Sequence, residues 1–422
     1  MHAKITGVKP VPKKTFDSRA DAVISRRAAD RLHSGHVWVY RSDILQLPAV
    51  KEDEAVPRLL PVTDQRGLLL GTALYSPASE IPLRLISTEL IADEAAWLDL
   101  LTERLRRAIA ARVSMLSEAI NACRLVFSEA DALPGIVIDK YGELVILQLL
   151  SKAVDNEAVR IVVTQVLREA LHPATIVERP DPRIRELEQL STPLDPAPLY
   201  SRDADEPLLA TIFRLNGLNF HYDATAGQKT GAFLDQRENY VAAARHVHGE
   251  ALDICTYQGG FALHMAQACS HVTGVDVSHA ALEVAEKNLA ANPQLSAKVD
   301  WVEANAFDLL RDWSDAGNQY DTIVLDPPAF AKSKRAVEGA LRGYKEMNLR
   351  AMKMLRPGGV LVTCSCSHHV SPADFTAVVA AAAGDAGRRV QLLERRGAAL
   401  DHPSILTIPE TEYLKCLICR VE

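Results

Sequence analysis

The pattern of apolar and polar positions changes near residue 250. From there on, short apolar runs alternate with stretches whose apolar residues recur at helical spacing. Strands are expected at 251–256, 271–277, 298–304, 320–326, 358–365, 389–395 and 413–421. Such alternation predicts an α/β fold, in which a mostly parallel sheet carries helices on both faces. The last two strands lie close together in the sequence, so we expect the sheet to end in a hairpin.

The first half of the chain has a different pattern. Short strand-like segments joined by turns occupy residues 22–88 and predict a small β-barrel. Helical periodicity at 92–122 and 154–171 surrounds strand-like segments, the most apolar of which begins at Leu144. The Pro- and Asp-rich segment 181–210 has the composition of a connector. We therefore expect three domains: a β-barrel at 22–88, an α+β linking domain at 89–205 and an α/β domain at 206–422.

The composition of the chain limits the classes of protein to which it can belong. The hydrophobic content of 48% and the charged content of 24% are typical of a globular protein, and no apolar run approaches the roughly 20 residues of a membrane-spanning helix. The N-terminus lacks the apolar core of a signal peptide, which favours a cytoplasmic protein with no membrane partner. Seven cysteines, an odd number, do not suggest a disulfide framework. Cys416 and Cys419 form a lone CxxC in an apolar strand, where core packing is favoured over a metal site.

The net charge of −7 argues against indiscriminate binding to nucleic acid, but the charge is uneven. Residues 1–50 contain nine Lys and Arg against four acids, and residues 329–356 contain eight against two. Local basic surface on an acidic body suits selective docking to a polyanion. Solvated helix faces with no partner are the alternative.

Chemistry-bearing residues follow the first strands of the predicted α/β domain, where open sheets bind their ligands. The first strand contains Asp253 and leads into a turn with Gly259 and Gly260, where the absence of side chains lets the backbone approach a ligand. The second strand ends at Asp276, whose carboxylate suits the two hydroxyls of a ribose. A helix N-cap is the alternative for Asp276, but Ser278 is the better cap. The turn lacks GxGxxG, which argues against a dinucleotide.

The third and fourth strands lead to Asn305 and to the run DPPAF that begins at Asp326. Two prolines stiffen the chain there and would hold a flat base in register. This order of strand ends resembles the class I S-adenosylmethionine-dependent methyltransferases. In that family the glycine turn approaches the methionine part of the cofactor, the acid binds the ribose, and the third strand end flanks adenine. Asn305 stands where the family usually has Asp, and its amide oxygen can still accept from the adenine amino group.

Further motifs resemble one group within that family, the RlmI-type cytosine-5 methyltransferases of large-subunit ribosomal RNA. They are QKTGAFLDQR from Gln228, DPPAFAKSK from Asp326, GGVLVTCSCS from Gly358 and SEADALPGIVIDKYG from Ser128, while RLHSGHVWVYRSDI from Arg31 resembles the RNA-binding PUA barrel of that group. The resemblance extends from about residue 22 to the end. It implies a Rossmann-like methyltransferase domain after a PUA domain, S-adenosylmethionine as the cofactor, and methylation of a cytosine in 23S ribosomal RNA.

The resemblance also implies site residues. Candidate cofactor-binding residues are Gln228, Thr230, Phe233, Asp253, Tyr257, Gly259, Gly260, Asp276, Asn305, Ala306 and Asp326. Candidate RNA-binding residues are Arg31, Lys229, Arg237, Lys332, Lys334 and Arg335. No metal is expected, and a homodimer is left open.

Two thiols, Cys364 and Cys366, lie two residues apart in the predicted strand 358–367 and therefore on the same face. A metal site needs more ligands than His368 and His369 provide, because adjacent side chains of an extended chain diverge. A disulfide would strain the strand. Inert packing and nucleophilic attack remain as interpretations.

The nucleophile hypothesis has a chemical reason. C5 of cytosine is too weakly nucleophilic to accept a methyl group unaided, and addition of a thiolate at C6 activates it. The family pattern S-C-S falls on residues 365–367, which implies that Cys366 is the nucleophile and Asp326 its catalytic partner, as an acid or as a hydrogen-bond acceptor. Cys364 is expected to pack in the core. The competing functions are methylation of a base nitrogen, which needs no thiol, and a non-catalytic RNA-binding factor in ribosome assembly.

Overall fold

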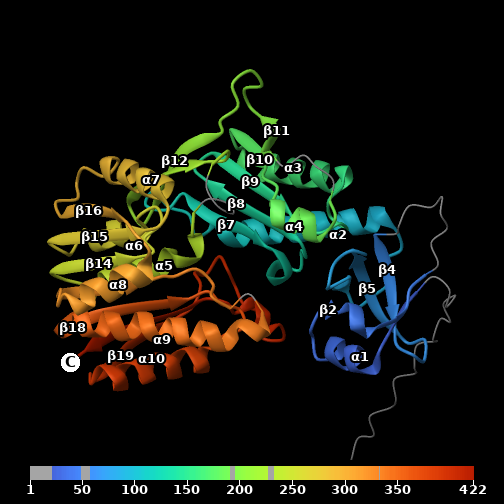
Figure 1. Ribbon diagram of the computed structural model, residues 1–422. Helices are drawn as coiled ribbons and strands as arrows, with labels where there is room; N and C mark the ends of the chain where they lie inside the picture. Colours follow the sequence, from blue (N-terminus) through green and yellow to red (C-terminus); the bar gives the residue numbers. More distant parts are fainter. Residues whose placement is uncertain (1–20, 49–57, 191–194, 227–231, 332) are drawn as a thin grey trace, which may run out of the picture.

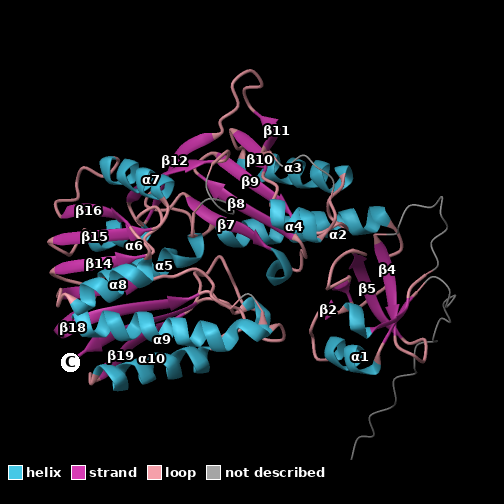
Figure 2. Cartoon of the chain, viewed as in Figure 1, coloured by secondary structure: helices cyan, strands magenta, loops and turns pink. Residues whose placement is uncertain are grey.

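Four sheets organise the protein, as the computed structural model in Figures 1 and 2 shows. The structure describes residues 21–48, 58–190, 195–226, 232–331 and 333–422. In these segments no helix is both long and apolar enough to cross a membrane.

The N-terminal sheet has six strands in the order β2-β6-β5-β4-β1-β3. Its elements are β1 (Ala22–Ile24), α1 (Arg26–His33), β2 (Trp38–Val39), η1 (Arg41–Asp43), β3 (Ile44–Gln46), β4 (Leu59–Thr63), β5 (Leu69–Tyr75) and β6 (Leu83–Ser87). Ile24, Val62 and Leu83 belong to a hydrophobic cluster confined to this sheet and α1. Only strands were predicted here, so α1 corrects the sequence reading. Ser25 starts this helix by accepting the N–H of Ala28.

The linking sheet has five strands in the order β11-β10-β9-β8-β7. Its elements are α2 (Glu94–Val113), β7 (Ala122–Phe127), η2 (Ser128–Asp131), β8 (Ile136–Tyr141), β9 (Leu144–Leu149), α3 (Glu157–Leu171), β10 (Thr175–Glu178), α4 (Pro182–Leu187) and β11 (Ala197–Ser201). Every residue of β9 is buried, as its unbroken apolar run predicts. The helix predicted at 92–122 is shorter, and the expected connector contains α4 and β11. Asp181 caps α4 and Pro182 begins it, a common helix start that the sequence reading missed.

A hairpin of β12 (Ala210–Leu215) and β13 (Leu218–Asp223) connects the linking sheet to the C-terminal sheet. Tyr222 of the hairpin stacks on Tyr141 of β8, with 3.9 Å between the ring centroids. One hydrophobic cluster contains both rings together with Val360 and Val362 of the C-terminal sheet. The linking and C-terminal sheets therefore share a core that extends across residue 205.

The C-terminal sheet has seven strands in the order β16-β15-β14-β17-β18-β20-β19. Its elements are η3 (Leu234–Gln236), α5 (Arg237–Ala244), β14 (Glu250–Ile254), α6 (Gly260–Met265), β15 (His271–Asp276), α7 (His279–Ala290), β16 (Lys298–Glu303), α8 (Ala306–Asp315), β17 (Tyr320–Leu325), η4 (Lys334–Ala336), α9 (Val337–Met354), β18 (Leu355–Ser365), α10 (Pro372–Ala386), β19 (Val390–Arg396), η5 (Pro409–Thr411) and β20 (Lys415–Val421). Strands β14 to β18 are parallel, whereas β20 is antiparallel to both of its neighbours. The predicted α/β sheet and its terminal hairpin are confirmed.

Alternate residues of these strands pack against helices on opposite faces. Helices α8, α9 and α10 cover one face, and α5 and α6 cover the other (Figure 2). Cys416 lies in the cluster on one face and Cys419 in the cluster on the other, both buried. The expectation that this CxxC packs in the core is therefore confirmed.

Candidate active site

The candidate residues gather at the carboxyl ends of the parallel strands. Strand order reverses between β14 and β17, and the connections from these two strands leave in opposite directions to open a crevice. Asp276 is the last residue of β15, Asp326 and Cys366 come directly after β17 and β18, and Asn305 is the second residue after β16. The sheet thus brings to one edge side chains that lie up to 90 residues apart in the chain.

The turn after β14 is strained. Cys255 and Tyr257 have positive φ values of 64° and 51°, which side chains disfavour, and Gly259 has φ 85°. A Cβ at Gly260 would lie 2.5 Å from the ring of Tyr240, so only glycine permits α6 to begin there. Non-glycine residues with positive φ are frequent at functional sites, where the surrounding structure holds them in this conformation. The turn is a rigid backbone cradle rather than a passive connection.

Asp253 supports this turn from below. Its side chain is fully buried, and Oδ2 accepts hydrogen bonds from Thr256 Oγ1 at 2.6 Å and from the N–H of Ala262 at 2.9 Å. Oδ1 has no hydrogen-bond partner among the described residues. Burial raises the pKa of Asp253 to about 7, and the two hydrogen bonds only partly oppose that rise. Asp253 is placed to hold the cradle and does not itself line its surface.

Asp276 is held by the backbone on both sides. Oδ2 accepts the N–H of Tyr257 at 2.9 Å, and Oδ1 accepts the N–H of Ser278 at 2.9 Å. Ser278 is the N-cap of α7, as expected. A carboxylate has about four acceptor positions, so each oxygen keeps one for a ligand hydroxyl. The geometry fits a ribose with two neighbouring hydroxyls.

Asn305 requires a correction. Its Oδ1 caps α8 by accepting the N–H groups of Phe307 and Asp308, at 2.9 and 3.3 Å. This oxygen is therefore occupied, and the expected bond from the adenine amino group to it is wrong. The N–H of Ala306, in the first turn of α8, has no partner inside its helix. A ring nitrogen of adenine fits that donor, so Ala306 is better placed than the Asn305 oxygen to recognise the base.

Asp326 is oriented by a side chain from η3. Gln236 Nε2 donates to Asp326 Oδ1 at 3.0 Å, and Gln236 Oε1 in turn accepts from Asn239 at 2.6 Å. Gln236 is 2% exposed, so this amide holds the carboxylate and is not free to contact RNA phosphate. The N–H of Asp326 bonds to Ile254 O at 3.1 Å, which ties the DPP turn to β14.

Cys366 lies one residue beyond the end of β18, and not within the strand as predicted. Its Sγ is 3.9 Å from the carbonyl oxygen of Pro327, in the DPP turn, and its side chain is partly exposed. Cys364 is fully buried opposite Cys416, as expected for a core residue, and burial raises its pKa well above the ordinary value. The second thiol of the pair is therefore the one that is accessible.

The two serines beside Cys366 explain the S-C-S pattern. Ser365 Oγ donates to the Tyr344 hydroxyl at 3.0 Å, and the same hydroxyl is 2.9 Å from Ser367 Oγ. Ser367 Oγ also accepts the N–H of Ala331 at 3.1 Å. All three bonds are buried, so they hold the backbone on both sides of the thiol and join it to the loop after β17.

The remaining cofactor candidates lie on the segment before η3. Phe233 packs edge-on against Tyr257, with 5.0 Å between the ring centroids, which places both rings over the glycine turn. Gln228 and Thr230, together with the RNA candidates Lys229 and Lys332, lie outside the described residues. They remain predictions.

Of the other RNA candidates, only two present free-standing charge. Lys334 and Arg335 are exposed on η4, directly after the DPPAF loop. Arg237 is 3% exposed, and its guanidinium lies 3.5 Å from the buried Asp401. The expected contact of Arg237 with RNA is wrong in this structure, because its guanidinium is buried and paired with Asp401. Arg31 bonds to Asp43 at 2.6 Å and lies over the ring of Tyr40, so it braces the N-terminal sheet.

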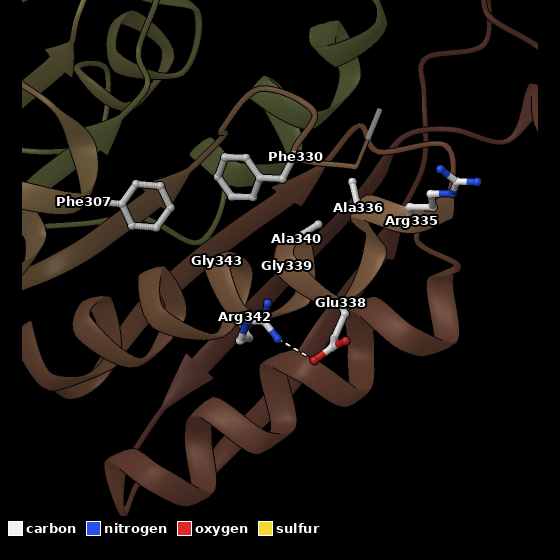
Figure 3. A pocket seen from close by; sticks show the side chains of 9 residues that line it. All are labelled: Phe307, Phe330, Arg335, Ala336, Glu338, Gly339, Ala340, Arg342 and Gly343. Atoms are coloured by element: carbon white, nitrogen blue, oxygen red, sulfur yellow. Dashed lines mark hydrogen bonds and ion pairs between the residues drawn. The ribbon is translucent and has the colours of Figure 1, made fainter. Parts of the chain in front are cut away.

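A pocket of about 500 Å³ opens beside the DPPAF loop (Figure 3). The rings of Phe307 and Phe330 stand 5.7 Å apart on one side of it, Arg335 lies on the side away from the rings, and Arg342 is paired with Glu338 (Figure 3). A Cβ at Gly343 would contact both rings, so the glycine leaves their faces accessible. Paired aromatic faces next to guanidinium groups suit a planar base and its phosphate.

Several site residues were not predicted from the sequence. They are Tyr344, Tyr413 and Lys415, which surround the segment 365–367. The signal for Lys415 was a charged residue directly before the apolar run CLIC at the start of the strand KCLICRV. Among the described residues no group of three or more His, Cys, Asp or Glu side chains could hold a metal ion.

Comparisons with known proteins agree with this geometry. Residues 190–416 match the family model of the S-adenosylmethionine-dependent methyltransferases, and residues 23–88 match that of a PUA-like domain. Ribosomal RNA large subunit methyltransferase I of Shewanella amazonensis is 39% identical over 92% of this chain and 95% of its own. The Escherichia coli protein of the same name is 34% identical over 94% and 98%.

A solved structure shares the fold. A protein from Streptococcus mutans, described as a SAM-dependent methyltransferase, matches 95% of this chain and 99% of its own with a TM-score of 0.78 at 18% identity. The predicted PUA barrel and Rossmann-like methyltransferase domain are confirmed, as is S-adenosylmethionine as the cofactor. The chain belongs to the S-adenosylmethionine-dependent methyltransferase family, in the group typified by ribosomal RNA large subunit methyltransferase I.

Proposed function

We propose that this protein methylates C5 of a cytosine in large-subunit ribosomal RNA, in the cytoplasm, with Cys366 as the nucleophile. The observation that carries the proposal is the position of the Cys366 thiol, partly exposed past β18 and 3.9 Å from the Pro327 carbonyl at the cofactor edge of the sheet. The names of the full-length relatives supply the class of RNA.

The thiol has a defined chemical task. S-adenosylmethionine supplies an electrophilic methyl group, but C5 of cytosine is a poor nucleophile. Addition of the Cys366 thiolate to C6 breaks the aromatic system and gives C5 the electron density to form the new C–C bond. A base then removes the C5 proton, and elimination across C5–C6 expels the thiolate and restores the ring. A thiolate suits both steps, because it is a strong nucleophile and a good leaving group near neutral pH.

Asp326 is the catalytic partner in this proposal. Asp326 directly precedes Pro327 in the chain, and a hydrogen bond from Gln236 fixes the orientation of its carboxyl group. Facing the N3/N4 edge of the cytosine, it hydrogen-bonds to the base while negative charge develops in the ring. A carboxyl group in this place acts only on a base that has left its stack, so we infer that the target nucleotide is flipped into the site.

RNA docking is assigned to two surfaces. The PUA-like domain, residues 22–88, provides the first, through exposed cations such as Arg26 and Arg27 on α1. The second comprises Lys334 and Arg335 together with the pocket of Phe307 and Phe330, next to the proposed catalytic loop. In this assignment Lys334 and Arg335 hold phosphates beside the target, where they position the RNA without reading its sequence.

The test uses RNA in which 5-fluorocytosine replaces the target base. Fluorine replaces the C5 proton, and a base cannot remove it. A methylated protein–RNA adduct should therefore accumulate and be visible by denaturing electrophoresis and mass spectrometry. Cys366→Ala should lose both the adduct and turnover, whereas the matched control Cys364→Ala should keep both.

Other results would redirect the proposal. An adduct that persists in Cys366→Ala and is lost in Cys364→Ala would move the nucleophile to the buried thiol. Full methylation by the double variant would exclude covalent catalysis and favour methylation of a base nitrogen. RNA binding without any methyl transfer would favour an assembly factor.

A further inference from the structure

Lys415 has an unusual environment beside the proposed nucleophile. It begins β20 directly opposite Ser365, the residue before Cys366, in the antiparallel pairing with β18. The residue is 4% exposed, and its Nζ donates to Ser367 O at 2.7 Å and to Tyr413 O at 2.8 Å. Both acceptors are neutral carbonyls, and one of them belongs to the residue after Cys366. The ammonium group is therefore fixed against the backbone that carries the thiol.

This ammonium lacks an acidic partner. No carboxylate within the described residues lies within 4 Å of it, and the nearby acid Asp235 instead accepts the Tyr413 hydroxyl at 2.6 Å. Burial lowers the pKa of Lys415 to about 8, while the charge of Cys366, and less so that of Glu412, acts in the opposite direction. Buried charges in proteins are normally paired. The thiolate of Cys366 is the anion that would complete this pair.

We propose that Lys415 is a positioning residue whose ammonium group stabilises the thiolate form of Cys366. The inference rests on the proposed function, because it supplies a reason for the nucleophile to be ionised at neutral pH. A nearby opposite charge favours the ionised form of a titratable group, and Lys415 is held against the residue that follows Cys366.

The two tyrosines described beside Cys366 do not supply this charge. Tyr344 approaches from α9 and Tyr413 from the segment before β20, and burial raises the pKa of each, so both stay neutral near pH 7. Asp326, on the loop after β17, is an acid and opposes formation of a thiolate. Lys415 is a buried cation whose ionisation responds to the charge of Cys366, so its removal should make the thiolate less stable.

The experiment measures thiol ionisation directly, without RNA or cofactor. The full-length protein is alkylated with iodoacetamide over a range of pH, and modification of Cys366 is quantified by fragment-ion mass spectrometry, which separates it from Cys364. Lys415→Met should raise the midpoint pH of alkylation by at least one unit, about a tenfold loss of thiolate at neutral pH. Lys415→Arg, which keeps the positive charge, should have an alkylation midpoint close to that of the parent protein. Lys298→Met, which removes an exposed lysine from β16, is the matched control and should not change the midpoint.

Two results would overturn the inference. One is an unchanged midpoint in a folded Lys415→Met protein, which would leave Lys415 as a link between strands only. The other is an equal shift in Lys415→Arg, which would mean that packing and not charge sets the ionisation.

A second measurement protects the test against misfolding of these variants. By linkage, Cys366→Ser should lower the pKa of Lys415 in otherwise unaltered protein, as followed by NMR of isotopically labelled lysine. An unchanged Lys415 titration would reject the pairing. A shifted midpoint without RNA methylation would reject only the proposed function, whereas methylation through Cys366 with an unshifted midpoint would reject only the role of Lys415.

Discussion

Replacing Asp276 by Ala should weaken binding of S-adenosylmethionine by roughly 10- to 150-fold. Each carboxylate oxygen already accepts one backbone N–H and keeps one acceptor position for a ribose hydroxyl. Loss of charge-assisted hydrogen bonds of this kind costs about 1.5–3 kcal/mol, and 1.4 kcal/mol corresponds to a tenfold change in Kd. Isothermal titration calorimetry with the purified protein measures the change.

The control is the acid at the end of the neighbouring strand. Glu303 is paired in register with Asp276, but it is 55% exposed and bonds to His279. Glu303→Ala should bind the cofactor normally. Asp276→Asn should fall between the parent and Asp276→Ala, because an amide oxygen keeps an acceptor without the charge. An unchanged Kd in a folded Asp276→Ala protein would refute the placement of the ribose.

Four further outcomes are expected. Deleting residues 1–88 should weaken RNA binding while leaving cofactor affinity near normal in calorimetry, and the RNA affinity of the parent should fall steeply with salt. The free energy of unfolding of Asp253→Asn, measured with urea, should rise relative to that of the parent as pH increases from about 4 to about 7. The difference should reach up to ~4 kcal/mol. The sign follows because burial raises the folded pKa of Asp253 to about 7, so ionisation over this range favours the unfolded chain. Phe330→Ala should raise the KM for RNA without changing the Kd for the cofactor, because the pocket beside the DPPAF loop is assigned to RNA docking. Cys364→Ala should lower the free energy of unfolding by about 1 kcal/mol, as a small core truncation.

The order of strands and helices in the C-terminal half followed from periodicity because short apolar segments alternate there with stretches of helical spacing. The buried β9 was predicted from its unbroken apolar run, and the terminal hairpin from the close spacing of the last two strands. Helix α1 was missed because its eight residues contain four charged side chains and only a narrow apolar stripe. Its boundary was signalled by the cap at Ser25 rather than by periodicity.

Those site residues that lie at the carboxyl ends of strands could be predicted from the sequence. Asp276 and Asp326 stand at such ends, and their positions could be read from the sequence. The cap that Asn305 forms on α8 is local, because its partners lie two and three residues ahead and Asn is a preferred capping residue. By contrast, the burial of Arg237 against Asp401 and the bond of Lys415 to Ser367 O, next to Cys366, depend on segments that are distant in the chain. Tertiary pairing of that kind leaves no local pattern.

The core shared across residue 205 determines how the molecule should lose its structure. Because the stacked rings of Tyr141 and Tyr222 belong to the same hydrophobic cluster as Val360 and Val362, the linking sheet cannot detach without exposing the interior of the methyltransferase sheet. The two should melt in a single cooperative transition. The N-terminal sheet has its own cluster around Ile24 and Val62, but Leu74 of β5 and Ile86 of β6 pack in the hydrophobic cluster of α2 and the linking sheet. Loss of the N-terminal sheet should therefore also expose part of the apolar surface of α2 and the linking sheet.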